Sequence, residues 1–254
     1  MVPLTVAFIV LGCSFGAALV GMYLNRALSE RYLDTESREV VKLVMGLVAT
    51  MAALVLGLLV ASANGSHQEQ TSELRDLSAN IILLDRTLAL YGPDAATVRS
   101  GLRDVVQQTH DSVWSPDGVR RPENLNSATV QSAAKTKLAQ VAALEPKTDM
   151  QQMLKAHAFD QVDNVTKSRL QMFESRGGQI PWPFLAVLIF WICILFLGFG
   201  LLAHFNGTVT VALFLGAISV AGAIFLILEL NEPYSGLLQI SDKPLQMAID
   251  QLNR

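Results

Sequence analysis

Four long stretches without Asp, Glu, Lys, Arg or His constrain this fold more than any other feature. They span residues 2–25, 43–66, 180–203 and 205–228. Each is at least as long as the roughly 20 residues that a helix needs to cross a bilayer. A continuous helix also satisfies its own backbone hydrogen bonds inside lipid. The sequence therefore predicts an all-α polytopic membrane protein with four transmembrane helices.

The composition supports this prediction. The chain is 51% hydrophobic and only 16% charged, which is too apolar for an ordinary soluble domain. Its net charge of −3 gives no reason to expect a nucleic-acid partner. Both cysteines, Cys13 and Cys193, lie inside apolar stretches, so neither a disulfide framework nor a metal site is predicted. The first stretch has no basic segment before it and is long for a signal peptide, so we expect a retained anchor.

The predicted order is a helix pair, a helical extramembrane insert, a second helix pair and a tail. The expected boundaries are 1–62, 63–178, 179–230 and 231–254. Apolar residues in the insert alternate at spacings of three and four, which predicts a helical seam that continues from the second span. These residues are Leu74, Leu77, Ile81, Leu84, Leu88 and Tyr91. Gly92 and Pro93 are expected to end this helix.

Further helices are predicted in the insert at residues 94–109, 126–144 and 148–176. The first of them places Val98, Leu102 and Val105 on one face. Residues 111–123 contain a Ser-Pro-Asp-Gly sequence and are expected to form a loop, with His110 and Asp111 exposed to solvent. A short amphipathic helix should begin after Ser241 and Asp242, with one apolar face formed by Leu245, Ala248, Ile249 and Leu252.

Two features of the second span suggest roles for individual residues. Ser37 is predicted to cap the helix, and Glu39 then lies in the first turn, where the helix dipole favours a carboxylate. A stripe of small residues follows, formed by Gly46, Ala49, Ala53 and Gly57. Small residues allow helices to pack closely, and they also keep a pore open, so packing and pore lining both remain possible.

No Asp, Glu, Lys, Arg or His lies in the interior of the membrane segments. Proton relays and voltage sensors require such residues, so a proton-driven pump is disfavoured. In the first span, Gly12 and Gly16 are spaced as in a helix-packing motif. These observations favour a passive conduit or a structural role.

Enzyme chemistry has little support in the sequence. The four histidines, His67, His110, His157 and His204, are scattered and lack the spacing of a helical metal pair. The sequence has no phosphate-binding loop, nucleophile elbow or pair of cysteines two residues apart. We therefore expect no enzyme activity, no cofactor and no metal.

The end of the fourth span has an unusual sequence, LELNEPYSG, at residues 228–236. Glu229 and Glu232 are expected to bracket the water boundary, and Pro233 forbids helix there. Tyr234 suits a membrane interface, and Gly236 permits a reversal that returns residues 237–240 to an apolar surface. The prediction is a turn that docks the tail against the insert.

Two blocks of sequence resemble the bestrophin-like (DUF4239) family of bacterial membrane proteins. They are ESREVVKLVMGLVATMAALVLGLLVASA at residues 36–63 and AGAIFLILELNEPYSGLLQIS at residues 221–241. The stretches NIILLD at residues 80–85 and IPWPF at residues 180–184 agree with this resemblance. It covers essentially the whole chain.

The resemblance extends more distantly to bestrophins, which have four spans, a helical insert after the second and an acidic-Pro-aromatic-x-Gly turn after the fourth. Bestrophins are pentameric ion channels whose second helix lines the pore. In calcium-gated members, carboxylates near the turn help to bind calcium, whereas residues 237–241 here supply no acidic cluster.

The resemblance thus implies a homo-oligomeric, pentameric channel or channel-like pathway for an inorganic ion in a bacterial inner membrane. The second transmembrane helix would line the pore. The alternative is a non-conducting membrane scaffold or accessory subunit whose insert binds a protein partner or a ligand.

The side of the membrane that holds the insert stays open. Four crossings place the insert and both termini on the same side. Basic residues between the first two spans favour a cytoplasmic loop there and an external insert: Arg26, Arg31, Arg38 and Lys42. The resemblance and the basic residues before the third span favour the opposite orientation: Lys167, Arg169 and Arg176.

Overall fold

The computed structural model describes residues 2–27, 35–114, 127–174, 182–203, 205–232 and 236–253. All the regular secondary structure assigned within these residues is helical, which confirms the all-α fold. The chain divides into two units. The first comprises Met1–Ser66, Gln179–Glu232 and Gly236–Leu238; the second comprises His67–Gly178, Pro233–Ser235 and Gln239–Arg254.

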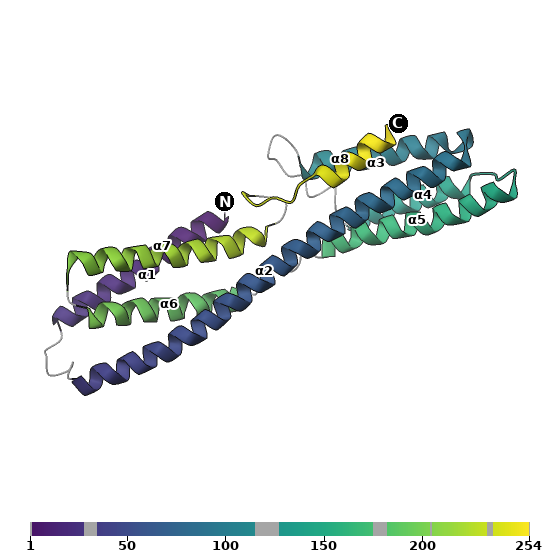
Figure 1. Cartoon of the computed structure of the whole chain (residues 1–254). Helices are drawn as coiled ribbons and strands as arrows, with labels where there is room; N and C mark the ends of the chain where they lie inside the picture. Colours follow the sequence, from purple (N-terminus) through teal and green to yellow (C-terminus); the bar gives the residue numbers. More distant parts are fainter. Residues whose placement is uncertain are drawn as a thin grey trace. The chain divides into compact units, whose positions relative to one another are not determined.

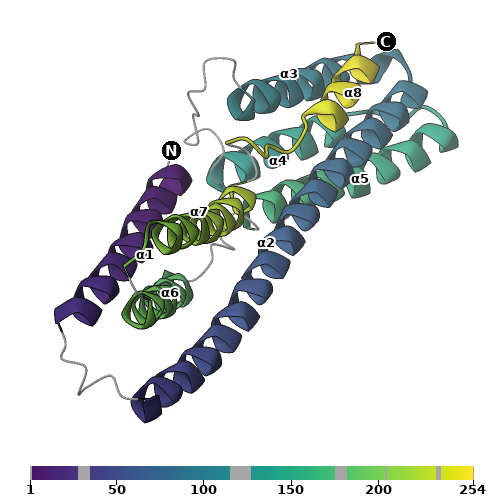
Figure 2. The ribbon, with the colours of Figure 1, turned by 60° about the vertical axis from the view of Figure 1, so that its left-hand side comes forward.

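The first unit contains α1 (Val2–Ala27), the start of α2 (Thr35–Tyr91), α6 (Trp182–Leu202) and α7 (Gly207–Leu230). Each of these helices has the length and hydropathy needed to cross a membrane, which confirms the prediction of four spans. In this unit α1 packs against both α6 and α7 (Figures 1 and 2).

The contact between α1 and α6 brings the two backbones together. A Cβ atom on Gly21 would lie 2.8 Å from the backbone nitrogen of Leu201, and one on Gly200 would lie 3.0 Å from that of Met22. The side-chain amide of Asn25 also donates a hydrogen bond to the carbonyl of Leu201. Glycine is therefore needed on both helices, because any side chain would push them apart.

Within the chain, α1 packs closely at a different glycine from the pair that the sequence singled out. Neither Gly12 nor Gly16 has an atom of this chain within 4 Å of its ideal Cβ position. Within the chain, α1 makes its close contact about one turn further along, at Gly21.

The second unit contains the rest of α2, the short helix η2 (Pro93–Ala95), α3 (Ala96–Val113), α4 (Ser127–Ala142), α5 (Asp149–Glu174) and α8 (Lys243–Leu252). The predicted seam of α2 is buried at all six positions in its core. All four apolar residues predicted for the terminal helix are buried as well. α8 packs against α3, which confirms that the tail docks on the insert.

α2 is one continuous helix of 57 residues, as the sequence between the second span and the seam suggested. It ends at Tyr91, where Gly92 adopts a φ of +109° that favours glycine. The side chain of Gln151, near the start of α5, donates a hydrogen bond of 3.0 Å to the freed carbonyl of Tyr91. The last carbonyl of α2 therefore has a hydrogen-bond partner on α5.

Two polar contacts tie other helices to α2. The guanidinium of Arg99 on α3 donates two hydrogen bonds to the buried carboxylate of Asp85, with distances of 2.7 and 2.9 Å. The amide of Asn80 donates to the hydroxyl of Ser168 on α5, at 3.1 Å. These contacts fix the register of α3 and α5 against α2.

Two local predictions were wrong. α2 begins at Thr35, so Ser37 lies inside its first turn and not at the cap, and Glu39 lies beyond that turn. α3 continues to Val113, so residues 111–113 are helical rather than a loop, while residues 115–126 lie outside the described part of the chain. Val98 and Leu102 of the predicted face of α3 are buried and Val105 is partly buried, and Val106 is buried beside them.

Candidate functional site

One face of α2 packs inside the membrane unit. It carries Met45, Ala52, Leu59 and Ala63, all of which are buried. The sulfur of Met45 lies against Gly198 of α6, 2.6 Å from where a Cβ atom would be, so Gly198 makes room for it. Met45, Ala52 and Leu59 are seven residues apart and Ala63 follows Leu59 by four, so all four lie on the side of α2 that faces the rest of this unit.

The small-residue stripe of α2 lies beside this packed face. Gly46 and Ala53 each follow a buried residue by one position, so they are turned by about 100° around the helix axis. Gly46, Ala53 and Gly57 are exposed, and Ala49 is partly buried. Ideal Cβ atoms on Gly46 and Gly57 would have nothing within 4 Å. Within the described chain, most of the stripe is therefore unoccupied.

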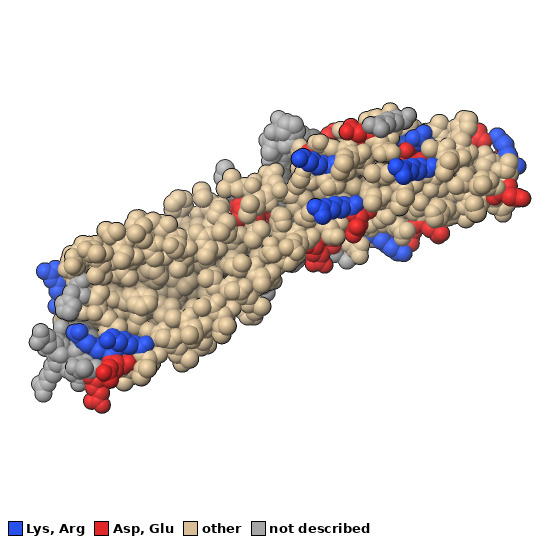
Figure 3. Space-filling model, viewed as in Figure 1, with Lys and Arg blue, Asp and Glu red and all other residues tan. Residues whose placement is uncertain are grey.

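α2 is also the least buried of the four spans. Only 17% of its most apolar window is buried, against 33% for α6. Large apolar side chains of α2, such as Leu47, Leu54 and Leu58, are exposed as well. On the face drawn in Figure 3, the membrane unit has a broad surface without charged residues. The outer side of α2 is thus free to meet lipid, another subunit or a lumen.

The turn after α7 is held by a buried carboxylate. Glu229 is only 4% exposed, so its carboxylate is enclosed by the chain. Its carboxylate accepts a hydrogen bond from the backbone N–H of Leu237. Gly236 has a φ of +93°, and a Cβ atom there would collide with the Glu229 carboxylate. Only glycine suits this position, both for its conformation and for its space.

The structure describes part of the rest of this turn. Glu232 lies at the end of the described segment, and Pro233 and Tyr234 lie outside the described residues. Leu237 and Leu238 are exposed, contrary to the prediction that they turn onto an apolar surface, whereas Ile240 is buried. The chain therefore re-enters a core only at Ile240.

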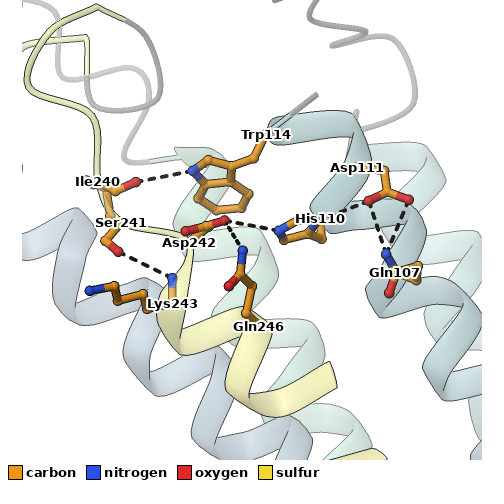
Figure 4. Close-up of polar contacts among 9 residues, drawn as sticks. All are labelled: Gln107, His110, Asp111, Trp114, Ile240, Ser241, Asp242, Lys243 and Gln246. Atoms are coloured by element: carbon orange, nitrogen blue, oxygen red, sulfur yellow. Dashed lines mark hydrogen bonds and ion pairs between the residues drawn. The ribbon is translucent and has the colours of Figure 1, made fainter. Parts of the chain in front are cut away.

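A polar cluster at the end of α3 holds the segment that leads into α8 (Figure 4). The indole N–H of Trp114 donates to the carbonyl of Ile240 at 3.2 Å. The ring of His110 stacks on Trp114, and its Nε2 lies 3.4 Å from the carboxylate of Asp242. His110 is thus partly buried in a helix contact, and the prediction that it lies in a solvated loop was wrong.

The structure brings together no candidate metal centre among the residues it describes. Within the described ranges, no group of three or more His, Cys, Asp or Glu side chains is arranged to hold a metal ion. The candidate site is therefore the exposed side of α2 together with the braced turn after α7.

Comparison with known proteins now identifies the family. A family model described as the Bestrophin-like domain matches residues 12–245. The chain belongs to the bestrophin-like family. This bestrophin-like protein is accordingly a helical integral membrane protein, and the family assignment favours a channel-like protein over an enzyme.

A solved structure shares the fold. It is a bacterial bestrophin homologue from Klebsiella pneumoniae, with a TM-score of 0.68 and 12% sequence identity. The alignment covers 97% of each chain, so the likeness includes the insert and the tail as well as the spans. No curated protein matches the bestrophin-like chain.

Proposed function

We propose that this bestrophin-like protein assembles as a homo-oligomer, a pentamer as in bestrophin channels, that forms an ion-conducting pathway lined by α2. The pathway would cross a bacterial inner membrane and carry an inorganic ion. The observation that carries this proposal is the exposed small-residue stripe on α2, since Gly46 and Gly57 face open space beside a helix face that is already packed.

Lipid alone is a poor explanation for such a stripe. Small residues gain little from contact with acyl chains, whereas they allow close subunit packing or leave room for water and ions. The large apolar residues that flank the stripe, such as Leu47 and Leu54, suit contact with a neighbouring subunit or a constriction that gates by dewetting. In the proposed assembly the stripe faces the lumen.

Reconstitution tests this proposal with a pair of matched variants. The purified protein should support ion flux into liposomes. Ala53→Leu should reduce that flux without changing the oligomer mass, because the larger side chain narrows the lumen. Ser62→Leu, on the opposite side of α2, should leave both quantities unchanged. A folded oligomer without flux would refute conduction, and a loss of oligomer mass in Ala53→Leu would show that the stripe packs between subunits.

The alternative role, a scaffold or accessory subunit, is favoured by one feature of the insert. Leu83 and Leu90 of α2 and Met150 and Met153 of α5 are exposed apolar side chains on the second unit. Such residues suit a protein contact. If liposomes show no flux, Leu90→Ser and Met153→Ser should weaken capture of a partner protein while leaving the fold intact.

A further inference from the structure

The ring of His110 on α3 lies between two carboxylates (Figure 4). Its Nδ1 is 3.1 Å from a carboxylate oxygen of Asp111, the next residue of the same helix. Its Nε2 is 3.4 Å from a carboxylate oxygen of Asp242, which directly precedes α8. The exposed fraction of the side chain is 15% for His110 and 29% for Asp242, against 62% for Asp111. The contact that joins α3 to the tail is therefore the better shielded from solvent.

Two carboxylates around one imidazole suit the charged form of the ring. An ionised carboxylate only accepts hydrogen bonds, whereas a neutral imidazole has one N–H and a lone pair on its other nitrogen. In a neutral His110, one nitrogen would therefore direct its lone pair at a carboxylate oxygen. The imidazolium has an N–H on each nitrogen and can donate to both carboxylates.

The other polar groups of this cluster do not change charge near neutral pH. The side-chain amide of Gln246 on α8 donates to the Asp242 carboxylate. On α3, the amide of Gln107 donates to Asp111 at 3.2 Å. Amides do not titrate, and carboxyl groups ordinarily titrate at about pH 4. Histidine changes charge between about pH 5 and 8, so His110 is the group of this cluster that responds in that range.

Cations of α5 and α8 near this cluster have other surroundings. Lys243, the residue after Asp242, is exposed. Arg169 of α5 donates a hydrogen bond of 3.2 Å to the hydroxyl of Thr109. Within the part of the chain that the structure describes, the cation that pairs with Asp242 is the protonated ring of His110.

Charged groups of α2 and α4 meet α3 at least two turns before His110. Asp85 of α2 pairs with Arg99. The ammonium of Lys137 on α4 lies beside Gly101, 2.5 Å from where a Cβ atom would be. The nearer of these positions, Gly101, is about 13 Å from His110 along the helix axis, so these groups are too distant to pair with the ring.

We propose that His110 is a proton switch for the docking of α8. In its charged form the ring pairs with Asp242 and strengthens the contact between α3 and α8, and in its neutral form this pairing is lost. The charged ring also gains a cation–π attraction to the indole of Trp114, since the two ring centroids are 5.8 Å apart. A contact that favours the protonated form adds stability at acidic pH and loses it as the pH rises through the titration of the ring. The apolar face of α8 keeps the helix docked at alkaline pH, but less firmly.

Hydrogen exchange of α8 in the full-length protein, in detergent, tests the switch. Exchange would be measured at about pH 5.5 and about pH 8, on either side of the range in which histidine titrates, and corrected for the intrinsic rate at each pH. Protection of α8 should be roughly three- to fivefold greater at the acidic pH, which is the size expected of a partly exposed ion pair.

Variants separate the ring from its neighbours. His110→Gln and Asp242→Asn should each abolish the dependence of α8 protection on pH. Asp111→Asn should keep it, because Asp111 belongs to the same helix as His110 and does not join that helix to α8. His157→Gln is the matched control, since His157 is exposed on α5, and it should also keep the dependence.

The fluorescence of Trp114 gives a second readout that does not depend on exchange. Replacing Trp182 and Trp191 by phenylalanine leaves Trp114 as the one indole in the sequence. An imidazolium stacked on an indole quenches its emission, so the emission of Trp114 should fall as the pH decreases through the histidine range. His110→Gln should remove this change.

Three results would overturn the inference. These are equal protection of α8 at the two pH values in the unmodified protein, an unchanged pH response in His110→Gln, or loss of the response in His157→Gln. If His110→Gln fails to fold, Asp242→Asn decides, because a full pH response in that variant refutes the pairing. The measurements need no ion flux, so their outcome is separate from that of the proposed channel function.

Discussion

The ion pair between Asp85 and Arg99 should be a main determinant of stability in the insert. Asp85 is buried, with only 5% of its side chain exposed, while 30% of the Arg99 side chain is exposed. Arg99→Met would leave the Asp85 carboxylate buried without its cation and remove two charge-assisted hydrogen bonds. Losing one partner of a fully buried pair costs about 3–5 kcal/mol. The partial exposure of Arg99 lowers our expectation to about 2–4 kcal/mol.

Thermal unfolding, followed by circular dichroism of the full-length protein in detergent, provides the measurement. For a unit of this size, each kcal/mol shifts Tm by roughly 3 °C, so we expect a decrease of about 6–12 °C. The hydrogen bond with Asp85 raises the pKa of Arg99 above its ordinary value. A raised pKa in a basic group stabilises the fold below its unfolded pKa, so the contribution is fully present at neutral pH and is lost only in strong alkali, as the pH rises through the raised pKa.

The matched control is the exposed pair between Lys147 and Asp94, at 2.8 Å. Lys147→Gln should leave Tm almost unchanged, because solvent screens this pair. The double variant Asp85→Leu with Arg99→Met should recover most of the stability, since neither partner is then left as a buried charge. Equal effects of Arg99→Met and Lys147→Gln would refute the reasoning.

Three further substitutions test the packing described above. Gly236→Ala should lower the free energy of unfolding by about 1–3 kcal/mol through its positive φ, whereas Gly222→Ala on α7 should be neutral or slightly stabilising in chemical denaturation. Gly200→Leu should separate α1 from α6 and reduce the yield of folded protein in size-exclusion chromatography, whereas Gly12→Leu should not. Leu245→Ala should cost about 2–5 kcal/mol and accelerate hydrogen exchange in α8; unchanged exchange would argue against the docking of α8.

Elements with a strong local pattern were predictable from sequence. The four spans follow from uninterrupted apolar length, and the seam from Leu74 to Tyr91 follows from its alternating three and four spacing. The apolar face of α8 follows from spacing alone in the same way. In each case one helix contains all the information needed, so no knowledge of its neighbours was required.

Features that depend on distant residues were not predictable. The chain has 17 glycines, and sequence spacing alone singled out Gly12 rather than Gly21. Gly21 packs against the backbone of Leu197 and Leu201, far along the chain, which nothing in the local sequence reveals. The extension of α3 to Val113 similarly accompanies contacts of His110 and Trp114 with the tail.

The candidate site was predicted only in part. The small-residue stripe was visible in the sequence, but its exposure beside a packed face required the structure. The sequence singled out Glu229 because it ends an apolar run, but its burial and its contact with Gly236 required the structure. Glu229 lies seven residues before Gly236 in the sequence. This spacing alone does not predict that the two residues are in contact, because the contact depends on how the chain turns between them.

Covalent modification of the small-residue stripe tests the central claim most directly. Currents would be recorded in a planar bilayer from Ala53→Cys, in a background where Cys13 and Cys193 are replaced by alanine. We predict that a charged, membrane-impermeant thiol reagent changes the current through the open assembly, because residue 53 faces water in the lumen. A conducting assembly whose current the reagent does not alter would contradict a pathway lined by this face of α2.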